Sequence, residues 1–190
     1  MSGSLPAASP TPPTPAASPG SDHPMRRLRL LKVVVNIGVG EAGERRTKAE
    51  RVITMLTGHK PVSTRAKSTN RDLGTRLGME IGAKVTLRGS DADAFLRRAL
   101  KTREDQLDPD SVDRAGNFAF GVPDYTDFDG MKYDPKIGIY GLDVCVELAR
   151  PGVRIRARSR SPRPLPRRQR PNPQETRRFL EQAFGVKFLE

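Results

Sequence analysis

The apolar residues of this chain follow two spacings, and each spacing predicts one kind of secondary structure. An apolar run rich in β-branched residues predicts a strand over about 28–37. A spacing of three and four residues then predicts a helix whose apolar stripe consists of Ala49, Val52, Ile53 and Leu56. Gly58 and Pro61 mark its end, because glycine suits the residue after a helix and proline cannot continue one.

The rest of the chain continues the same pattern. Further strands are predicted over 62–67, 81–87, 117–121, 137–149 and 153–158. In the last of these, apolar residues alternate with Arg154, Arg156 and Arg158, which gives that strand one basic face. A second apolar stripe predicts a helix over about 91–102, with Ser90 or Asp91 as its cap. The final helix starts at Asn172 and Pro173 and has an apolar stripe of Thr176, Phe179, Leu180 and Ala183.

The predicted order of elements is β-α-β-β-α-β-β-β-α. Strands that follow one another without a helix between them pair antiparallel. The sequence therefore predicts an α+β fold, an antiparallel β-sheet with helices packed on one face and the other face left for a partner. Flexible loops are expected between the elements: a mobile loop or hairpin tip at 69–79, an acidic loop at 104–116 and a long connection at 122–136.

The two ends of the chain differ in character. Residues 1–24 contain six prolines between Pro6 and Pro19 and no basic residue, which predicts a disordered tail. This tail lacks the charged and apolar regions of a signal peptide, and no apolar run in the chain reaches the length of about 18 residues that a membrane span needs. Residues 25–190 are expected to form a single domain that carries an Arg-rich segment at 150–170.

Charge is distributed in blocks, and the blocks indicate RNA binding. The chain has a formal net charge of +12, with balances of +8 over 45–88, −7 over 104–134 and +9 over 150–170. Of its basic residues, 25 are arginine, whose side chain contacts phosphate in a bidentate manner and stacks on bases. The two basic blocks form either two contact surfaces or one surface built from both, and the acidic block is expected to face away from phosphate.

The first basic block combines cations with small polar residues. Arg65, Lys67, Arg71 and Arg76 alternate with Ser, Thr and Asn, which together can contact phosphates and 2′-hydroxyls. The alternative is a solvated surface, but such a surface usually mixes both signs, and Asp72 is the only acid between Glu50 and Glu80. The alternative interpretation of the second block, residues 150–170, is a disordered basic tail. Such a tail would still bind nucleic acid electrostatically.

A glycine pattern offers a competing hypothesis of an enzyme. Gly38, Gly40 and Gly43 follow a predicted strand and precede a helix, as in a dinucleotide-binding fingerprint. Residues 51–71 contain no acid for a ribose, although Arg65 could select a 2′-phosphate, and Glu41 would repel a pyrophosphate. The favoured reading is a strand-to-helix turn whose backbone N–H groups approach RNA.

Other reactive residue types point to no cofactor, metal or catalytic set. The acidic residues Asp124, Asp127, Asp129 and Asp134 lack the ligand spacing of a calcium loop and are read as a solvated loop. His23 and His59 are far apart and have no cysteine at zinc spacing. Cys145 is the only cysteine, which excludes an internal disulfide; its valine neighbours predict a buried thiol in a strand rather than a nucleophile.

Six segments, taken in order, resemble one known family. They are KVVVNIGVGEAGE, LTGHKPVSTRAKST, IGAKVTLRG, NFAFG, YDPKIGIYGLDVCVELARPG and FLEQAFGVKF. Together they are similar to the universal ribosomal L-five family over residues 25–188, and the Arg-rich insertion resembles the archaeal and eukaryotic branch. The resemblance implies a ribosome-bound cytoplasmic protein that docks on 5S rRNA in the central protuberance, and not an enzyme. It also implies contact with large-subunit rRNA, peptidyl-site tRNA, and neighbouring ribosomal proteins including a small-subunit bridge protein.

The resemblance also carries residue roles onto this sequence. For 5S rRNA it implies Asn36, His59, Thr64, Arg65, Lys67, Ser68, Thr69 and Arg88. For a loop that contacts tRNA it implies Asn70, Arg71, Gly74, Thr75, Arg76 and Gly78. Further rRNA contacts are expected from Arg154, Arg156, Arg158, Arg160, Arg167 and Arg168. His59 stands where some members have glutamine, and a free RNA chaperone or regulator with the same binding face is a third hypothesis beside the ribosomal protein and the enzyme.

Overall fold

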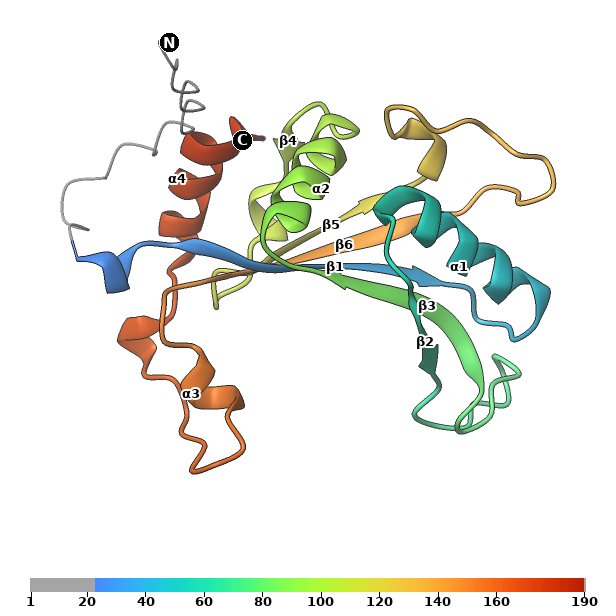
Figure 1. Ribbon diagram of the computed structural model, residues 1–190, viewed down its shortest axis with the longest axis horizontal. Coiled ribbons are helices and arrows are strands. Elements are labelled where there is room, and N and C mark those ends of the chain that lie inside the picture. Colours follow the sequence, from blue (N-terminus) through green and yellow to red (C-terminus); the bar gives the residue numbers. More distant parts are fainter. Residues whose placement is uncertain (1–22, 190) are drawn as a thin grey trace, which may run out of the picture.

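A five-stranded antiparallel sheet organises the protein, in a computed structural model that describes residues 23–189 (Figure 1). Its strand order is β2-β3-β1-β6-β5. The strands are β1 (Arg29–Gly38), β2 (Val62–Arg65), β3 (Glu80–Leu87), β5 (Phe118–Val122) and β6 (Leu142–Ala149). All four pairings are antiparallel, as the order of elements predicted.

The longer helices lie on one side of this sheet (Figure 1). They are α1 (Glu44–Thr57), α2 (Ser90–Lys101) and α4 (Pro173–Phe184), and a fourth, four-residue helix is α3 (Arg154–Ala157). Four 3₁₀ turns are η1 (Pro24–Arg26), η2 (Pro109–Ser111), η3 (Tyr125–Asp127) and η4 (Arg167–Gln169). The expected α+β fold is therefore confirmed. The predicted tail over 1–24 falls almost wholly outside the described residues.

The core lies between the sheet and the helices. Alternate residues of β1, Val33, Val35 and Ile37, are buried against it. All four residues of the predicted α1 stripe are buried too, and Gly58 ends that helix in the left-handed region at φ 71°. In the second half, the rings of Phe95 on α2 and Phe128 stack with centroids 5.8 Å apart. Burying each such side chain stabilises the fold by roughly 2 kcal/mol.

A second, two-stranded sheet joins the middle of the chain to its C-terminal part. β4 (Gln106–Leu107) pairs in parallel with β7 (Lys187–Phe188). The sequence pattern did not reveal these strands, because two residues are too few to show a period. Beside them, the buried Thr176 hydroxyl of α4 donates to the carbonyl of Gly116 over 3.0 Å. α4 is therefore fixed to the preceding acidic loop as well as to the core.

Several predicted boundaries were wrong. The segment 153–158 is not a strand: residues 154–157 form α3, because the chain has left the sheet at the Pro151–Gly152 turn and no neighbouring strand is available for pairing. β6 begins at Leu142 rather than at 137, and β2 ends at Arg65 rather than at 67. The cap of α2 is Gly89, at φ 62°, and not Ser90 or Asp91.

Candidate nucleic-acid interface

The face of the sheet opposite the three longer helices is open. Because successive side chains of a strand point to opposite faces, the residues that alternate with the buried ones lie on this open face. The register places β1 residues Lys32, Val34 and Asn36 there, opposite Glu147, Cys145 and Asp143 of β6. On the other side of β1, Thr86 and Lys84 of β3 complete the row. The face thus carries cations, small polar groups, two acids and a few apolar side chains.

Asn36 and Thr64 are the predicted 5S rRNA residues that belong to this face. Asn36 lies between Lys84 and Asp143 in neighbouring strands, and Thr64 lies opposite Gly82. A side chain at position 82 would come within 2.7 Å of the Ile37 carbonyl oxygen and 2.8 Å of the Thr64 hydroxyl. Only glycine at position 82 therefore lets β1 and β2 lie this close to β3, because any larger residue would displace the Thr64 hydroxyl or the Ile37 carbonyl.

Lys32, Lys84 and Thr86 are open-face residues that can donate hydrogen bonds to RNA and were not among the sequence candidates. The alternation in β3 could have revealed two of them, since Lys84 and Thr86 interleave with the buried Ala83, Val85 and Leu87. Lys32 gave no such signal, because it stands in a run of apolar residues. Its position follows from the β1–β6 register alone.

A shallow hollow of about 250 Å³ opens on this face over β1, β5 and β6. Its lining includes Val34, Phe118, Ala119 and Cys145, and its charged groups are Lys32, Glu147 and Asp113. The apolar part of this lining suits the flat face of an unstacked base.

The β2–β3 hairpin projects from one end of the sheet, on the side away from α1 and α2 (Figure 1). Its tip is closed by two backbone hydrogen bonds between Asn70 and Thr75, of 2.9 and 3.0 Å, and Gly78 N–H donates to the Ala66 carbonyl over 3.0 Å. Thr69 accepts the Leu77 N–H through its hydroxyl over 3.1 Å. The predicted loop is thus a hydrogen-bonded hairpin tip. Thr75 is buried, and the exposed side chains of the tip are those of Lys67, Ser68, Thr69, Asn70, Arg71, Asp72, Leu73, Arg76 and Leu77.

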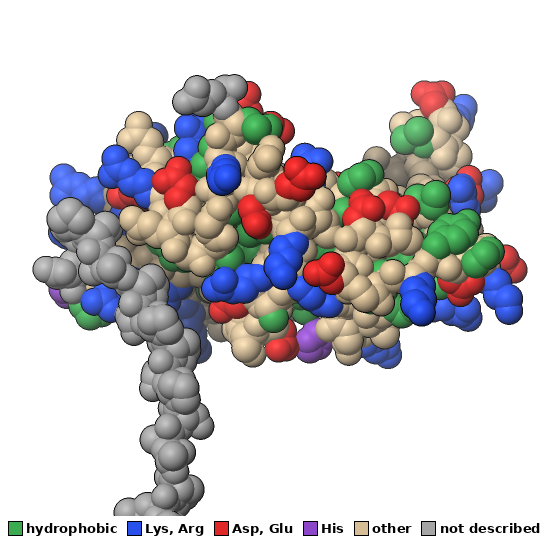
Figure 2. Space-filling view, turned by 90° about the horizontal axis from the view of Figure 1, so that it is seen from above, with side chains coloured by type: hydrophobic (Ala, Val, Ile, Leu, Met, Phe, Trp, Pro, Cys, Tyr) green, Lys and Arg blue, Asp and Glu red, His purple; other side chains and the backbone are tan. Residues whose placement is uncertain are grey.

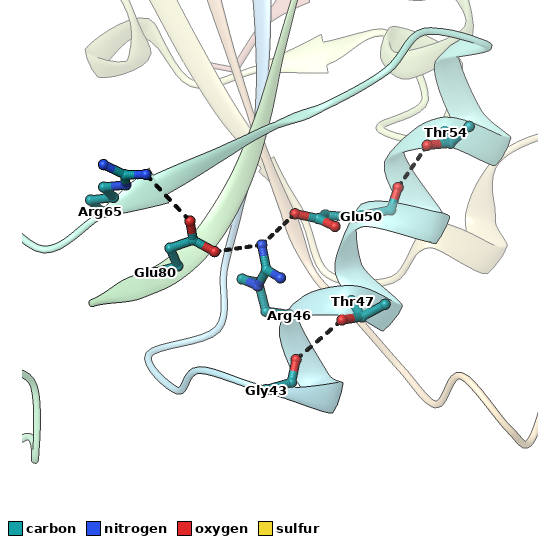
Figure 3. A network of polar contacts seen from close by, with 7 residues as sticks. All are labelled: Gly43, Arg46, Thr47, Glu50, Thr54, Arg65 and Glu80. Carbon is teal, nitrogen blue, oxygen red and sulfur yellow. Dashed lines mark hydrogen bonds and ion pairs between the residues drawn. The ribbon is translucent and has the colours of Figure 1, made fainter. Parts of the chain in front are cut away.

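Arg65 joins the hairpin to α1 through a chain of ion pairs (Figure 3). Arg46 of α1 contacts both Glu50 and Glu80 over 2.8 Å, and Glu80 lies 3.7 Å from the Arg65 guanidinium. The Arg65 side chain nevertheless remains 71% exposed. It can therefore contact a phosphate without breaking the Arg46 pairs, which keep the base of the hairpin in place.

The Arg-rich segment 150–170, which contains α3, forms a second projection on the same side of the sheet as the hairpin (Figure 1). We call it the arginine arm. Its two ends are tied together, because Arg150 donates to the Arg168 carbonyl over 2.7 Å and Gln169 donates to the Pro151 carbonyl over 2.9 Å. Arg150 also pairs with Glu175 of α4 over 2.6 Å. The predicted rRNA residues are all exposed on this arm: Arg154, Arg156, Arg158, Arg160, Arg167 and Arg168.

The hairpin part of the first basic block and the arginine arm therefore flank one surface, while the α1 part of that block lies in the helical layer. The hairpin and the arginine arm stand at opposite ends of the sheet and project to its open side (Figure 1). The side covered by helices is different: there acidic and basic side chains are interspersed (Figure 2). On the open side, the two cationic projections offer positive charge to a phosphate backbone.

Two predicted residues stand apart from the open face. His59 follows α1, and its imidazole Nε2 lies 3.1 Å from the Asp91 carboxylate at the start of α2. The structure thus gives His59 a protein partner within the helical layer. Arg88 is exposed directly after β3, at the end of that strand away from the hairpin.

The glycine turn does not form a dinucleotide site. The N–H groups of Val39 and Gly40 both donate to the Ile81 carbonyl, over 3.0 and 2.9 Å. These donors are therefore not available to a pyrophosphate, nor to an RNA phosphate as the sequence suggested. The strand before the turn also has antiparallel neighbours on both sides, unlike the strand of a dinucleotide fold.

Cys145 is exposed, which corrects the prediction of a buried thiol. The flanking Val144 and Val146 point into the core, so the alternation of the strand turns Cys145 to the open face. Partial burial raises the pKa of the thiol, and the Asp143 carboxylate on the same face raises the pKa further. The thiolate fraction near neutral pH is therefore smaller than that of a free cysteine.

The acidic loops are engaged in local turns. Asp124 accepts the Thr126 N–H over 3.0 Å at η3, and Asp134 accepts the Lys136 N–H over 2.9 Å. These bonds hold the carboxylates within the loop that connects β5 to β6. Between residues 23 and 189, no helix is long and apolar enough to cross a membrane.

Comparison with known proteins identifies the family of this chain. Residues 80–188 match a family profile described as the ribosomal L5P family C-terminus, and residues 23–76 match one described as ribosomal protein L5. The chain belongs to the uL5 family of the large ribosomal subunit. It is similar to the uL5 protein of Methanococcus vannielii, with 45% identity over 170 residues that cover 88% of this chain and 94% of the relative.

Two further archaeal uL5 proteins show the same degree of similarity. That of Sulfurisphaera tokodaii is 47% identical over 169 residues, covering 88% of this chain and 96% of the relative. That of Thermoplasma volcanium is 49% identical over 166 residues, covering 87% and 98%. As a uL5 protein, the chain is a ribosome-bound structural constituent of the cytoplasmic large subunit and not an enzyme.

Proposed function

We propose that this uL5 protein binds 5S rRNA in the central protuberance through the open face of its sheet, with residues 25–190 acting as one RNA-binding domain. The observation that carries the proposal is the placement of two cationic projections, the hairpin and the arginine arm, around one uncovered face. Cations there neutralise phosphates, while Asn36 and Thr64 supply hydrogen bonds to sugars and bases. The apolar hollow adds a place for one unstacked base.

Cys145 provides a native reporter for this binding mode, because it is the only cysteine and lines the hollow. We expect 5S rRNA at about ten times its Kd to slow maleimide labelling of Cys145 roughly tenfold, since about a tenth of the protein stays free. Labelling of the free protein should accelerate as pH rises above neutral, because the raised pKa keeps the thiol protonated. Mass spectrometry of the labelled protein gives both rates.

An RNA of equal length and unrelated sequence is the control. It should protect Cys145 only at much higher concentration and lose its effect as salt is raised. Equal protection by both RNAs would contradict specific 5S rRNA binding. Tight binding of 5S rRNA without protection would place the RNA elsewhere than on the open face.

We further propose that the hairpin tip contacts peptidyl-site tRNA. The tip carries Arg71 and Arg76 as cations, and Leu73 and Leu77 are 72% and 70% exposed. Exposed leucines beside cations suit the ribose and base faces of a folded RNA, since they have no partner in the described part of the protein. The backbone bonds that close the tip hold these side chains outward.

For the bridge to the small subunit, we propose the loop between η3 and β6. It exposes Tyr133 and Ile139, with 56% and 66% of their surfaces accessible, next to Lys132 and Lys136. Aromatic and aliphatic side chains with a polar rim are typical of protein contacts rather than of phosphate contacts. We therefore propose that this loop contacts a ribosomal protein of the small subunit.

One crosslinking experiment tests both proposals. In a Cys145→Ala background, a photocrosslinker is attached to Leu73→Cys or to Tyr133→Cys, and each protein is assembled into ribosomes with peptidyl-site tRNA. We expect position 73 to crosslink tRNA and position 133 to crosslink a small-subunit protein. Each position is the control for the other, and the same products from both would refute the assignments.

A further inference from the structure

We propose that Glu147, an acid on the RNA-facing side of the sheet, strengthens RNA binding by positioning the arginine arm. Through it, the sheet and the arm act as one continuous binding surface for a single RNA. The inference rests on the proposed function and deepens it, since it names how the two parts of the surface are joined. An acid on an RNA-binding face is otherwise expected to weaken binding through repulsion of phosphate.

The Glu147 carboxylate contacts two cations at once. Its Oε2 lies 2.7 Å from Lys32 Nζ on β1, and its Oε1 lies 3.2 Å from Arg156 Nη2 on the arm. The Glu147 side chain is only 17% exposed, whereas the side chains of Lys32 and Arg156 are 32% and 60% exposed, so solvent screens the pair with Lys32 less than the pair with Arg156. Glu147, on β6, thus connects this strand to β1 and to the arginine arm.

The ion pair between Arg156 and Glu147 joins the arginine arm to the sheet. Among residues 23–189, the other ion pair of the arm is that of Arg150 with Glu175, which fixes the base of the arm to α4. Within the arm, the Arg163 N–H donates to the Ile155 carbonyl over 3.2 Å, so the two halves of the arm move together. Holding Arg156 against β6 therefore also places the cations that lie beyond it.

The base of the hairpin has a comparable arrangement. There Glu80 contacts Arg46 and Arg65, as Glu147 contacts Lys32 and Arg156 (Figure 3). In both places one carboxylate is shared by two cations. At the hairpin Arg46 also pairs with Glu50, so that group of four charges is neutral, whereas Glu147 with its two cations has a net charge of +1. Glu147 can therefore orient Arg156 while its group stays positive.

The test compares two neutralised acids on one strand face. Asp143 is exposed on β6, two alternations before Glu147, and none of the ion pairs within 23–189 involves it. We expect Glu147→Gln to weaken 5S rRNA binding about tenfold, as expected for loss of one ordered phosphate contact. Asp143→Asn, with the same change in charge, should leave binding unchanged or make it tighter. Tighter or unchanged binding by Glu147→Gln would overturn the proposal.

A double-mutant cycle separates positioning from a general loss of structure. In an Arg156→Ala background, Glu147→Gln should cause no further loss, because the positioned cation is already absent. An equal tenfold loss in that background would refute positioning through Arg156. If wild-type protein binds 5S rRNA no tighter than an unrelated RNA, the proposed function itself fails; if wild type is selective and Glu147→Gln is neutral, only this inference fails.

Discussion

Replacing both Arg65 and Lys67 by glutamate is expected to weaken 5S rRNA binding roughly 100-fold, at about tenfold for each cation reversed. Both residues stand where the hairpin leaves the sheet, and Arg65 is largely exposed despite its contact with Glu80. The slope of log K against log salt should fall in magnitude by about two, because two fewer counterions are released. Filter binding over a series of salt concentrations measures both quantities.

The matched control is Lys101→Glu with Arg103→Glu. These exposed residues lie at the end of α2, in the helical layer, and their reversal changes the net charge by the same amount. Binding should change little, apart from a weak long-range effect that salt removes. An equal loss in both double variants would mean that total charge, and not the hairpin, governs affinity.

Gly116→Ala is expected to lower the free energy of unfolding by about 3 kcal/mol, from left-handed strain of about 1–2 kcal/mol and overpacking of about 1–3 kcal/mol. Gly116 has φ +76°, and a Cβ there would lie 2.6 Å from Pro171 Cβ and 2.9 Å from the Thr176 hydroxyl oxygen. It would thus push α4 away from the acidic loop and strain the bond that Thr176 donates to the Gly116 carbonyl. Urea unfolding followed by circular dichroism gives the free energy.

Gly130→Ala separates the two causes. Gly130 has a similar φ of +86°, but no atom would lie within 4 Å of its new Cβ. Only the left-handed strain of about 1–2 kcal/mol should remain. If both variants lose the same stability, packing of Gly116 against Pro171 and Thr176 contributes nothing.

The regular elements were predictable where pattern and packing agree. The stripe from Ala49 to Leu56 and the alternation in β3 predicted buried faces that the structure confirms. The segment 153–158 shows the limit, since its alternation fits a strand but a strand also needs a neighbour. That neighbour depends on where the chain leaves the sheet, which a local pattern does not contain.

For the candidate site, the sequence predicted the cationic blocks but not their geometry. The resemblance suggested Asn36, and the β1–β3 register places Lys84 beside it. His59 was grouped with the RNA residues, and the structure pairs it with Asp91. Glu147 offered no signal, because its role depends on Lys32, which is distant in sequence and adjacent only across the β1–β6 pairing.

The strand order also constrains how a nascent chain can fold. β1 is central, between β3 and β6, and its partner positions in β6 follow about a hundred residues later. During synthesis, β3 can cover one edge of β1 early, while the other edge keeps its unpaired N–H and C=O groups until β6 has left the exit tunnel. A chain interrupted before β6 therefore exposes the unpaired edge of an apolar strand, which can pair with other chains. Chaperones and proteases that recognise such edges could detect these unfinished copies.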